Sequence, residues 1–395
     1  MRRTLIIAAT VIVLLGVAVA IYFLFFNKGA TISVGPGASL PSAGNTTPVS
    51  PVTSSTTVPA QPSVVTQRLT KISDGSVVPG EVVLDGTATA SSTAEATVQF
   101  IERESGNVYS YTARAGALTR ISNKTVPGIQ SAAWLPDGSL AFVRYLTGAD
   151  FSTINTYALS STGGNGFFLP QNLSDISVST TSVLTLASGV NGSIASLAKS
   201  NGSRSTEIFS TPLSALHLSF AGKNQYLAVS SPTATLPGAA FIVDSKGSFS
   251  RIAGPLNGLT AKASPSGKWV LLSYVDSGAL HTGIVNTTNG LYLPVPVSTI
   301  ADKCVWTTDE SAIYCGIPVD PSTQYNYPDD WYQGAVSFSD RIWKIQVAGR
   351  YAQLVLDFSK ETKTSLDAEA LSIDPLMTTL VFVNKIDGSL WKYSL

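Results

Sequence analysis

Charged residues and histidines are scarce in this chain of 395 residues. Lysine and arginine together number 25, aspartate and glutamate also number 25, and the formal net charge is zero. Without excess positive charge the chain has no electrostatic attraction for phosphate backbones, so nucleic acid is excluded as an expected partner. His217 and His281 are the only histidines and lie far apart in the sequence. Two scattered histidines do not form a ligand set, so no metal site is expected.

The sequence also lacks the short motifs of known catalytic and cofactor sites. It contains no Gly-x-Ser-x-Gly elbow, no His-Glu-x-x-His, no phosphate-binding Gly-rich lysine loop and no Asp-x-Asp-x-Asp loop. His217 alternates with apolar Leu216 and Leu218, which is typical of a core or channel residue. We therefore expect no catalytic residue, no cofactor and no enzyme activity. A carboxylate pair drawn from separated loops, as in a glycosidase, stays open as an alternative.

Long apolar runs are absent except for one at the N-terminus. Thr4–Phe26 is a run of 23 residues without a charge. A helix of this length extends about 34 Å and spans the roughly 30 Å hydrocarbon layer of a membrane. Two arginines precede the run and a single lysine follows it, so the positive-inside rule favours a cytoplasmic N-terminus and an exported body. We expect residues 1–28 to be a cytoplasmic stub and transmembrane signal anchor. A cleaved signal peptide is the alternative, but the small residues at Ala18–Ala20 precede further large apolar residues.

A segment rich in proline, serine and threonine follows the apolar run. Gly29–Gln67 carries no charged residue and has too few large apolar residues to build a core, so it is expected to be a flexible linker. A flexible chain of this length spans about 35 Å. An additional ordered strand is the alternative. The folded body is then residues 68–395.

The body contains a repeat with a period of about 43 residues. Each unit has an apolar run that ends just before a turn. The residues at that position are Trp134, Val178, Phe220, Ala263, Trp306 and Ile373, with spacings of 44, 42, 43, 43 and 67. One period before Trp134 lies Ser91, next to the apolar run Thr97–Ile101. A unit of this length holds four short strands, which predicts an all-β propeller of seven blades. Six or eight blades stay open because the first and third units are degenerate.

Two further pairs of similar segments predict how the ring closes. Leu69–Ser73 resembles Leu118–Ser122, at the place of an outermost strand. Ile342–Ile345 resembles Leu390–Tyr393, at the place of a third strand. The last unit therefore has three strands of its own, and we expect Leu69–Ser73 to pair with Ser389–Ser394 as the fourth. Such pairing removes the open edge of the terminal sheet.

The turns of the repeat resemble those of a known group of propellers. Trp134-Leu-Pro-Asp-Gly, Ala263-Ser-Pro-Ser-Gly-Lys and Trp306-Thr-Thr-Asp-Glu-Ser resemble the turn that joins the innermost strand to the next in WD-repeat-like and TolB-like propellers. The Gly-His and Trp-Asp marks of true WD repeats are missing. The resemblance covers residues 68–395. It implies the fold and partner binding through the loops that connect the blades, and it favours a bacterial cell envelope.

The two cysteines are predicted to form a disulfide. Cys304 and Cys315 lie on the two sides of a hairpin whose turn is centred between Asp309 and Glu310, so they are directly opposite each other. Opposed residues at a non-hydrogen-bonded position are within disulfide range. An exported body faces an oxidising compartment, which suits the bridge. Two buried free thiols are the alternative.

An insertion in the sixth unit, Pro318–Phe338, is the candidate binding loop. It falls between the second and third strands of its unit and is rich in aromatic and acidic residues. The candidate residues are Tyr325, Tyr327, Asp329, Asp330, Trp331 and Tyr332. Tyrosine and tryptophan are enriched at binding hot spots. The alternative is structural, with these aromatics packed onto neighbouring blades to cap the channel mouth.

These features predict a single-pass membrane protein whose body lies in the periplasm or at the cell surface. We expect a protein-binding or scaffold module of the cell envelope, with a membrane or envelope protein as partner and a polysaccharide as the second partner class. The alternative functions are a carbohydrate-active enzyme and a lectin-like binder that uses propeller-face loops.

Overall fold

The computed structural model describes residues 68–86 and 95–395. Among these residues, no helix is both long and apolar enough to cross a membrane. The predicted transmembrane anchor at 1–28, the predicted linker at 29–67 and the first repeat position at Ser91 lie outside the described residues.

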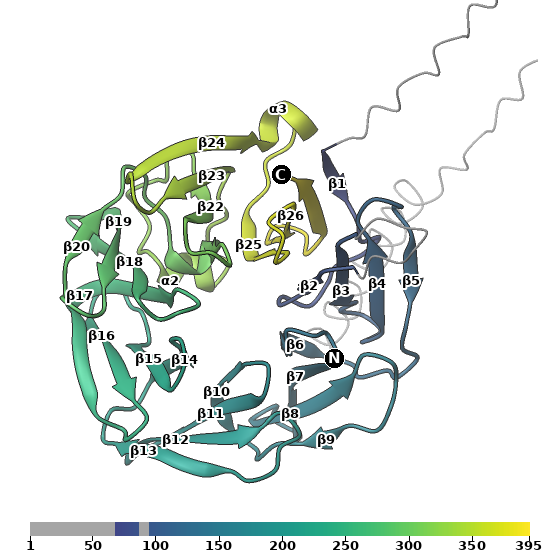
Figure 1. Cartoon of the computed structure of the whole chain (residues 1–395), viewed down its shortest axis with the longest axis horizontal. Coiled ribbons are helices and arrows are strands. Elements are labelled where there is room, and N and C mark those ends of the chain that lie inside the picture. Colours follow the sequence, from purple (N-terminus) through teal and green to yellow (C-terminus); the bar gives the residue numbers. More distant parts are fainter. Residues whose placement is uncertain (1–67, 87–94) are drawn as a thin grey trace, which may run out of the picture. The chain divides into compact units, whose positions relative to one another are not determined.

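The described residues form six antiparallel sheets, five of four strands and one of seven. Figure 1 shows them arranged around a ring. The first sheet along the chain contains β2 (Val82–Leu84), β3 (Thr97–Ile101), β4 (Val108–Thr112) and β5 (Leu118–Arg120). The second contains β6 (Ile129–Trp134), β7 (Leu140–Thr147), β8 (Thr153–Ser160) and β9 (Phe167–Phe168). The third contains β10 (Leu173–Val178), β11 (Ser182–Gly189), β12 (Gly192–Lys199) and β13 (Thr206–Thr211).

The fourth sheet has seven strands because one long strand belongs to two repeat units. It contains β14 (Leu216–Phe220), β15 (Gln225–Ser230), β16 (Pro237–Asp244), β17 (Phe249–Ala263), β18 (Trp269–Asp276), β19 (Ala279–Asn286) and β20 (Tyr292–Pro294). The first part of β17, up to Asn257, pairs with β16, and the part from Asn257 onward pairs with β18. Hydrogen bonding therefore gives six sheets where the repeat predicts seven units.

The remaining two sheets complete the ring. One contains β21 (Cys304–Trp306), β22 (Ala312–Pro318), β23 (Asp340–Gln346) and β24 (Tyr351–Asp357), preceded by the 3-10 helix η1 (Ala301–Lys303). The other contains β25 (Ala368–Ile373), β26 (Thr379–Asn384), β27 (Leu390–Ser394) and β1 (Leu69–Lys71). Two short helices, α2 (Asp329–Tyr332) and α3 (Phe358–Thr362), lie in connections.

The predicted closure of the ring is confirmed. β1 pairs antiparallel with β27, and Leu69 is opposite Tyr393 while Lys71 is opposite Trp391. The backbone N–H of Ser394 donates to the carbonyl of Arg68 at 2.9 Å. The first described strand thus occupies the outer edge of the last sheet (Figure 1).

The repeat positions are confirmed at each of the six places where the structure describes them. Every one of these residues ends the innermost strand of its unit, immediately before the turn. Neighbouring turns touch, and this contact requires glycine. Gly267 has φ +76°, and a Cβ at this position would lie 2.2 Å from the carbonyl oxygen of Ala221 in the preceding unit. The glycine of the repeat motif is therefore used both for its backbone conformation and for close packing.

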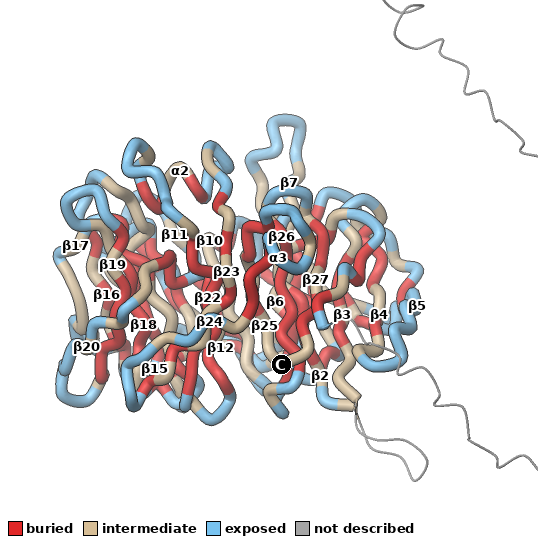
Figure 2. The backbone as a smooth tube through the Cα atoms, turned by 90° about the horizontal axis from the view of Figure 1, so that it is seen from above, coloured by how far each residue is buried: buried red, intermediate tan, exposed pale blue. Residues whose placement is uncertain are grey.

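The hydrophobic core lies between successive sheets. Figure 2 shows buried residues running along the strands within the ring. A representative cluster joins Leu184 and Leu186 of β11 to Leu216 and Leu218 of β14 in the next unit. Because each sheet buries both faces against its neighbours, apolar residues occupy consecutive positions in the second strands, as in Leu380–Val383, where every residue is buried.

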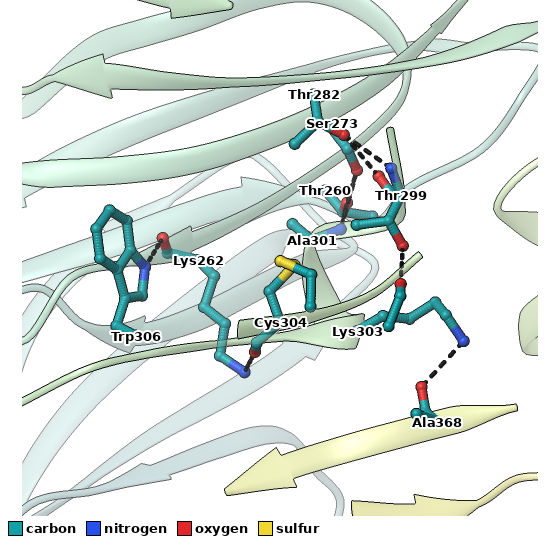
Figure 3. Close-up of a disulfide and its surroundings, with 12 residues drawn as sticks. Thr260, Lys262, Ser273, Thr282, Thr299, Ala301, Lys303, Cys304, Trp306 and Ala368 are labelled. Carbon is teal, nitrogen blue, oxygen red and sulfur yellow. Dashed lines mark hydrogen bonds between the residues drawn. A yellow bond between two sulfur atoms is a disulfide. The ribbon is translucent and has the colours of Figure 1, made fainter. Parts of the chain in front are cut away.

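The predicted disulfide is confirmed. Cys304 on β21 and Cys315 on β22 are directly opposite and bonded, with their α-carbons 4.1 Å apart. Figure 3 shows the bridge at Cys304 between Lys262 and Lys303, and both cysteines are fully buried. The described residues contain no free cysteine.

Candidate functional site

The insertion at Pro318–Phe338 is a folded loop whose largest side chain is buried. It joins β22 to β23, as expected, and contains α2, which Figure 2 shows at one face of the ring. Trp331 is only 2% exposed, and its indole N–H donates to the carboxylate of Asp367, with oxygens at 3.0 and 3.2 Å. Tyr327 is also buried and donates from its hydroxyl to the carbonyl of Ser322 at 2.8 Å. Trp331 therefore holds the loop to the body, while the Tyr327 hydrogen bond closes the loop on itself.

A fully buried ion cluster beneath the loop explains this attachment. The ammonium of Lys303 contacts the carboxylates of Asp340, at 2.8 Å, and of Asp367. It also lies 4.8 Å from the ring centre of Trp331 and 5.1 Å from that of Phe338. A buried charge requires such partners because the interior does not solvate it. The cluster thus fixes the loop where β21, β23 and β25 come together.

The cluster holds two carboxylates for one ammonium, and this affects proton binding. Burial raises the pKa of Asp340 to about 6, the ammonium of Lys303 opposes the rise, and the nearby Asp367 adds to it. The Asp340 Oδ1 atom has no hydrogen-bond partner among the described residues. Asp340 therefore binds a proton more tightly than an exposed aspartate does.

A cavity of about 550 Å³ lies beside the loop. Its walls come from the innermost strands β10, β14 and the second half of β17, and its rim includes the α2 residues Asp329 and Tyr332. Residues of β15, the loop after it and η1 also line the cavity, so segments from separate parts of the chain meet at one site. The size is within the usual range of small-molecule sites, about 300–1,000 Å³.

Asp175 and His217 form a pair in the cavity wall. The Oδ2 atom of Asp175 lies 3.5 Å from Nδ1 of His217 and accepts a hydrogen bond from the backbone N–H of Leu218 at 2.8 Å. Oδ1 of the same carboxylate accepts from the backbone N–H of Ile176 at 2.8 Å. The hydrogen bond to Asp175 raises the pKa of His217, and burial partly opposes this. The backbone donors hold the carboxylate in place, so it orients the imidazole toward the open cavity.

Lys262 is the second basic residue of the wall. Its ammonium donates to the carbonyl of Cys304 at 2.6 Å, which Figure 3 also shows. Burial lowers the pKa of Lys262, while the negative charges of Asp302 and Glu81 oppose the fall. The position of this cation is therefore fixed by the backbone of the disulfide-bonded strand.

Tyr332 and two carboxylates form the rim. The Tyr332 hydroxyl donates to Asp302, although 39% of the residue remains exposed. Burial of the hydroxyl and the charge of Asp302 raise the pKa of Tyr332 well above its ordinary value, so it stays a neutral donor. Asp329 accepts from the backbone N–H of Ala234 at 2.7 Å and from the hydroxyl of Thr233 at 3.3 Å. The insertion is thereby also tied to the loop between β15 and β16.

Glu81 is a buried acid near this wall that does not line the cavity. Neither of its carboxylate oxygens has a hydrogen-bond partner among the described residues. Burial raises the pKa of Glu81 to about 8, the charge of Glu369 adds to the rise, and that of Lys262 opposes it. At neutral pH Glu81 is therefore mostly protonated.

The structure places the six candidate loop residues in different surroundings. Asp329 and Tyr332 line the cavity, while Tyr327 and Trp331 belong to the core beneath the loop. Tyr325 is partly buried against that core, and Asp330 accepts from the backbone N–H of Asn326 at 2.7 Å within the loop itself. The structural role was the alternative for this loop, and these contacts give part of the loop that role; whether its exposed part binds a partner stays a prediction.

Sequence reasoning missed most of the cavity wall. Asp175 and His217 each lie three residues before the turn-preceding position of their unit, and Lys262 lies one residue before it. Titratable residues at these places in the innermost strands are a signal that the repeat alignment contains. Asp302 gives no such signal because it lies in a connection. No group of three or more potential metal ligands occurs in the described part of the chain.

No family model and no curated protein matches the sequence. Solved structures resemble the fold. Oligogalacturonate lyase in complex with manganese is 10% identical with a TM-score of 0.53, and the match covers 81% of this chain and 98% of that one. Hydrazine synthase from Kuenenia stuttgartiensis is 13% identical with a TM-score of 0.50, covering 80% and 96%.

A third similar structure is the β-propeller domain of the Trilobed protease from Pyrococcus furiosus, described as having an open velcro topology. It is 7% identical with a TM-score of 0.52, and the match covers 80% of this chain and 93% of that one. At these identities the likeness shows the fold alone. The chain thus has a β-propeller fold, and here β1 completes the last sheet.

Proposed function

We propose that this chain is a membrane-anchored propeller of seven four-stranded blades, with turns of the TolB-like type, that serves as a protein-binding or scaffold module of the cell envelope. The seven-blade count divides the long sheet at Asn257, where β17 changes partner. The disulfide supports placement of the body in an oxidising compartment outside the cytoplasm. The N-terminal apolar run supports the anchor.

The observation that carries the binding role is the attachment of the insertion loop. The buried contacts of Trp331 with Asp367 and Lys303 fix its backbone, while Tyr332 and the polar residues around Gln324 remain exposed. A loop that is already ordered loses little conformational entropy when a partner binds. Exposed aromatic and polar groups on such a support are typical of recognition surfaces.

In the proposed mechanism, the membrane anchor and linker hold the propeller near the membrane, where its loops are accessible to partners. The helix fixes the protein to the membrane, the linker sets the reach, and the ring presents its loop face to a neighbouring envelope protein. Tethering raises the effective concentration near other membrane proteins, so a weak contact becomes useful.

Site-specific photo-crosslinking in the host membrane tests this role. A photoreactive residue replaces Gln324, which is exposed in the insertion, or Lys246, which is exposed in the β16–β17 turn on the opposite face. We expect a discrete crosslinked envelope protein from position 324 and none from position 246. Equal or absent crosslinking at both positions contradicts the proposal.

A carbohydrate-active enzyme is the second candidate, and one observation favours it. Asp302 and Asp329 approach the same tyrosine hydroxyl at the cavity rim, and both charges raise the pKa of Tyr332. Two carboxylates beside one cavity are the minimum for glycoside hydrolysis. Release of reducing ends from a polysaccharide panel, abolished in Asp302→Asn, supports the enzyme, and absence of release leaves the binding role.

A further inference from the structure

We propose that the cavity between the innermost strands and α2 is a binding site for a neutral saccharide. This site shares Asp329 and Tyr332 with the insertion, but it does not depend on a protein partner. Three properties of the wall lead to this ligand class: an apolar floor, hydrogen-bonding groups of both kinds, and charges of both signs.

The floor of the cavity is apolar and rigid. Ile176 and Ala261 line it and are partly exposed, and the buried Leu218, Leu227, Val229 and Leu259 support them from β14, β15 and β17. A pyranose ring has an apolar face of C–H groups, which packs on such a floor, while its hydroxyls point to the sides. The volume of about 550 Å³ leaves room for more than a single water or ion.

The sides of the cavity offer both acceptors and donors. Asp302 and Asp329 each use Oδ2 for the hydrogen bonds described above, and Oδ1 of neither accepts one from the described residues. The ammonium of Lys262 has three N–H groups and donates one of them to Cys304. Ser177 and Ser219 add hydroxyls from neighbouring strands. A sugar hydroxyl both donates and accepts, so it satisfies either kind of group.

The wall carries the carboxylates of Asp175, Asp302 and Asp329 against one ammonium, Lys262, and one imidazole, His217, so its acidic excess disfavours an anionic ligand. The carboxylate of Asp175 lies next to His217, and the charge of Asp302 acts on Lys262. An anionic ligand meets the acidic rim, and a cationic one meets the ammonium. A neutral polar ligand is repelled neither by the carboxylates of the rim nor by the ammonium of Lys262.

The polar groups are also fixed before any ligand arrives. Backbone N–H groups of Ile176 and Leu218 hold the carboxylate of Asp175, and that of Ala234 holds Asp329. Groups held by the backbone of sheets and short loops lose little freedom on binding. The polar groups of the wall are therefore preorganised for ligand binding.

A glycan array probed with the full-length protein in detergent tests the proposal. The array carries neutral, uronic-acid and amino-sugar glycans. Ser219→Trp and Ser177→Trp fill the cavity from two different strands, and Ser245→Trp places the same side chain on an exposed turn as the matched control. We expect the wild type and Ser245→Trp to bind a set of neutral glycans, and the two cavity variants to bind them at least tenfold more weakly.

Two variants keep the test decisive when one of them does not fold, as judged by its thermal unfolding. Absence of binding to every neutral glycan overturns the proposal. Binding confined to charged glycans overturns the ligand class, and equal binding by the cavity variants and Ser245→Trp overturns the site.

Discussion

Asp175 on β10 accepts a hydrogen bond from the backbone N–H of Leu218 on β14, at 2.8 Å and across 43 residues of sequence. The separation equals one repeat. The ammonium of Lys262 reaches the carbonyl of Cys304 across 42 residues, and the indole N–H of Trp306 reaches the carbonyl of Lys262 across 44. Innermost strands expose one edge of unpaired backbone groups to the channel. Side chains from the neighbouring unit satisfy these groups and at the same time build the cavity wall.

The Asp175–His217 pair predicts a shift that can be observed directly. Because hydrogen bonding to Asp175 is the main cause that raises the pKa of His217, Asp175→Asn is expected to lower it. The chain has two histidines, so the imidazole C–H signals in an NMR titration are few, and His281→Gln assigns them. An unchanged titration midpoint for His217 in Asp175→Asn contradicts the pairing.

Glu81 predicts how stability depends on pH. Its pKa rises from 4.5 to about 8 in the folded protein, so the folded state binds the proton more tightly than the unfolded state. The stabilisation from this proton is fully present below pH 4.5 and is lost as the pH rises through 8. Glu81→Gln should remove a decline on the order of 4 kcal/mol in the free energy of unfolding.

Urea unfolding of wild type and Glu81→Gln at pH 5 and pH 9 measures this difference. Glu104→Gln, at an exposed position, is the control and should follow the wild type. Parallel profiles for wild type and Glu81→Gln disprove the assignment.

The buried indole predicts the cost of freeing the insertion. Trp331→Phe removes the N–H donor to Asp367 but keeps an aromatic ring over Lys303. A buried carboxylate that loses a donor costs about 1–3 kcal/mol, and we expect faster proteolysis within 318–338. Trp343→Phe, at a partly buried site in β23, is the control. Equal unfolding free energies and equal cleavage rates for both variants count against the anchoring role.

The disulfide predicts a stability loss when it is removed. The bridge closes a short loop, with a sequence separation of 11. The double variant Cys304→Ala, Cys315→Ala is expected to lower the free energy of unfolding by about 2–3 kcal/mol. Thiol labelling of the denatured, unreduced wild type should find no free thiol. Two labelled cysteines per chain show that the bridge is missing.

Features formed by residues close in sequence could be predicted, and those formed by distant residues could not. The turn after Trp134 and the opposition of Cys304 to Cys315 follow from one hairpin each, because alternation and turn chemistry fix the register. Ring closure is long-range, yet the resemblance between Leu69–Ser73 and Leu118–Ser122 revealed it. The similarity between repeat units thus predicted a contact between residues far apart in sequence, which the pattern of a single hairpin does not do.

The site was harder to predict because its parts look ordinary in the sequence. Lys303 follows Asp302 and precedes Cys304, a pattern typical of a solvated turn, yet it is fully buried. Its partners Asp340 and Asp367 come from other strands, so only the packed ring brings the charges together. The same holds for the cavity, whose polar residues come from different repeat units.

The closed ring depends most on the pairing of β1 with β27, and a designed cross-link tests this pairing directly. Lys71 and Trp391 are opposite each other, so cysteines at these two positions are expected to form a disulfide on mild oxidation. Cysteines at Lys71 and Arg120, which lie on the outer strands of two different sheets, form the control pair. We predict that mass spectrometry finds near-complete 71–391 bridging in the folded monomer and none between 71 and 120. Failure of the 71–391 pair to bridge, in a protein that is otherwise folded, contradicts the closed ring.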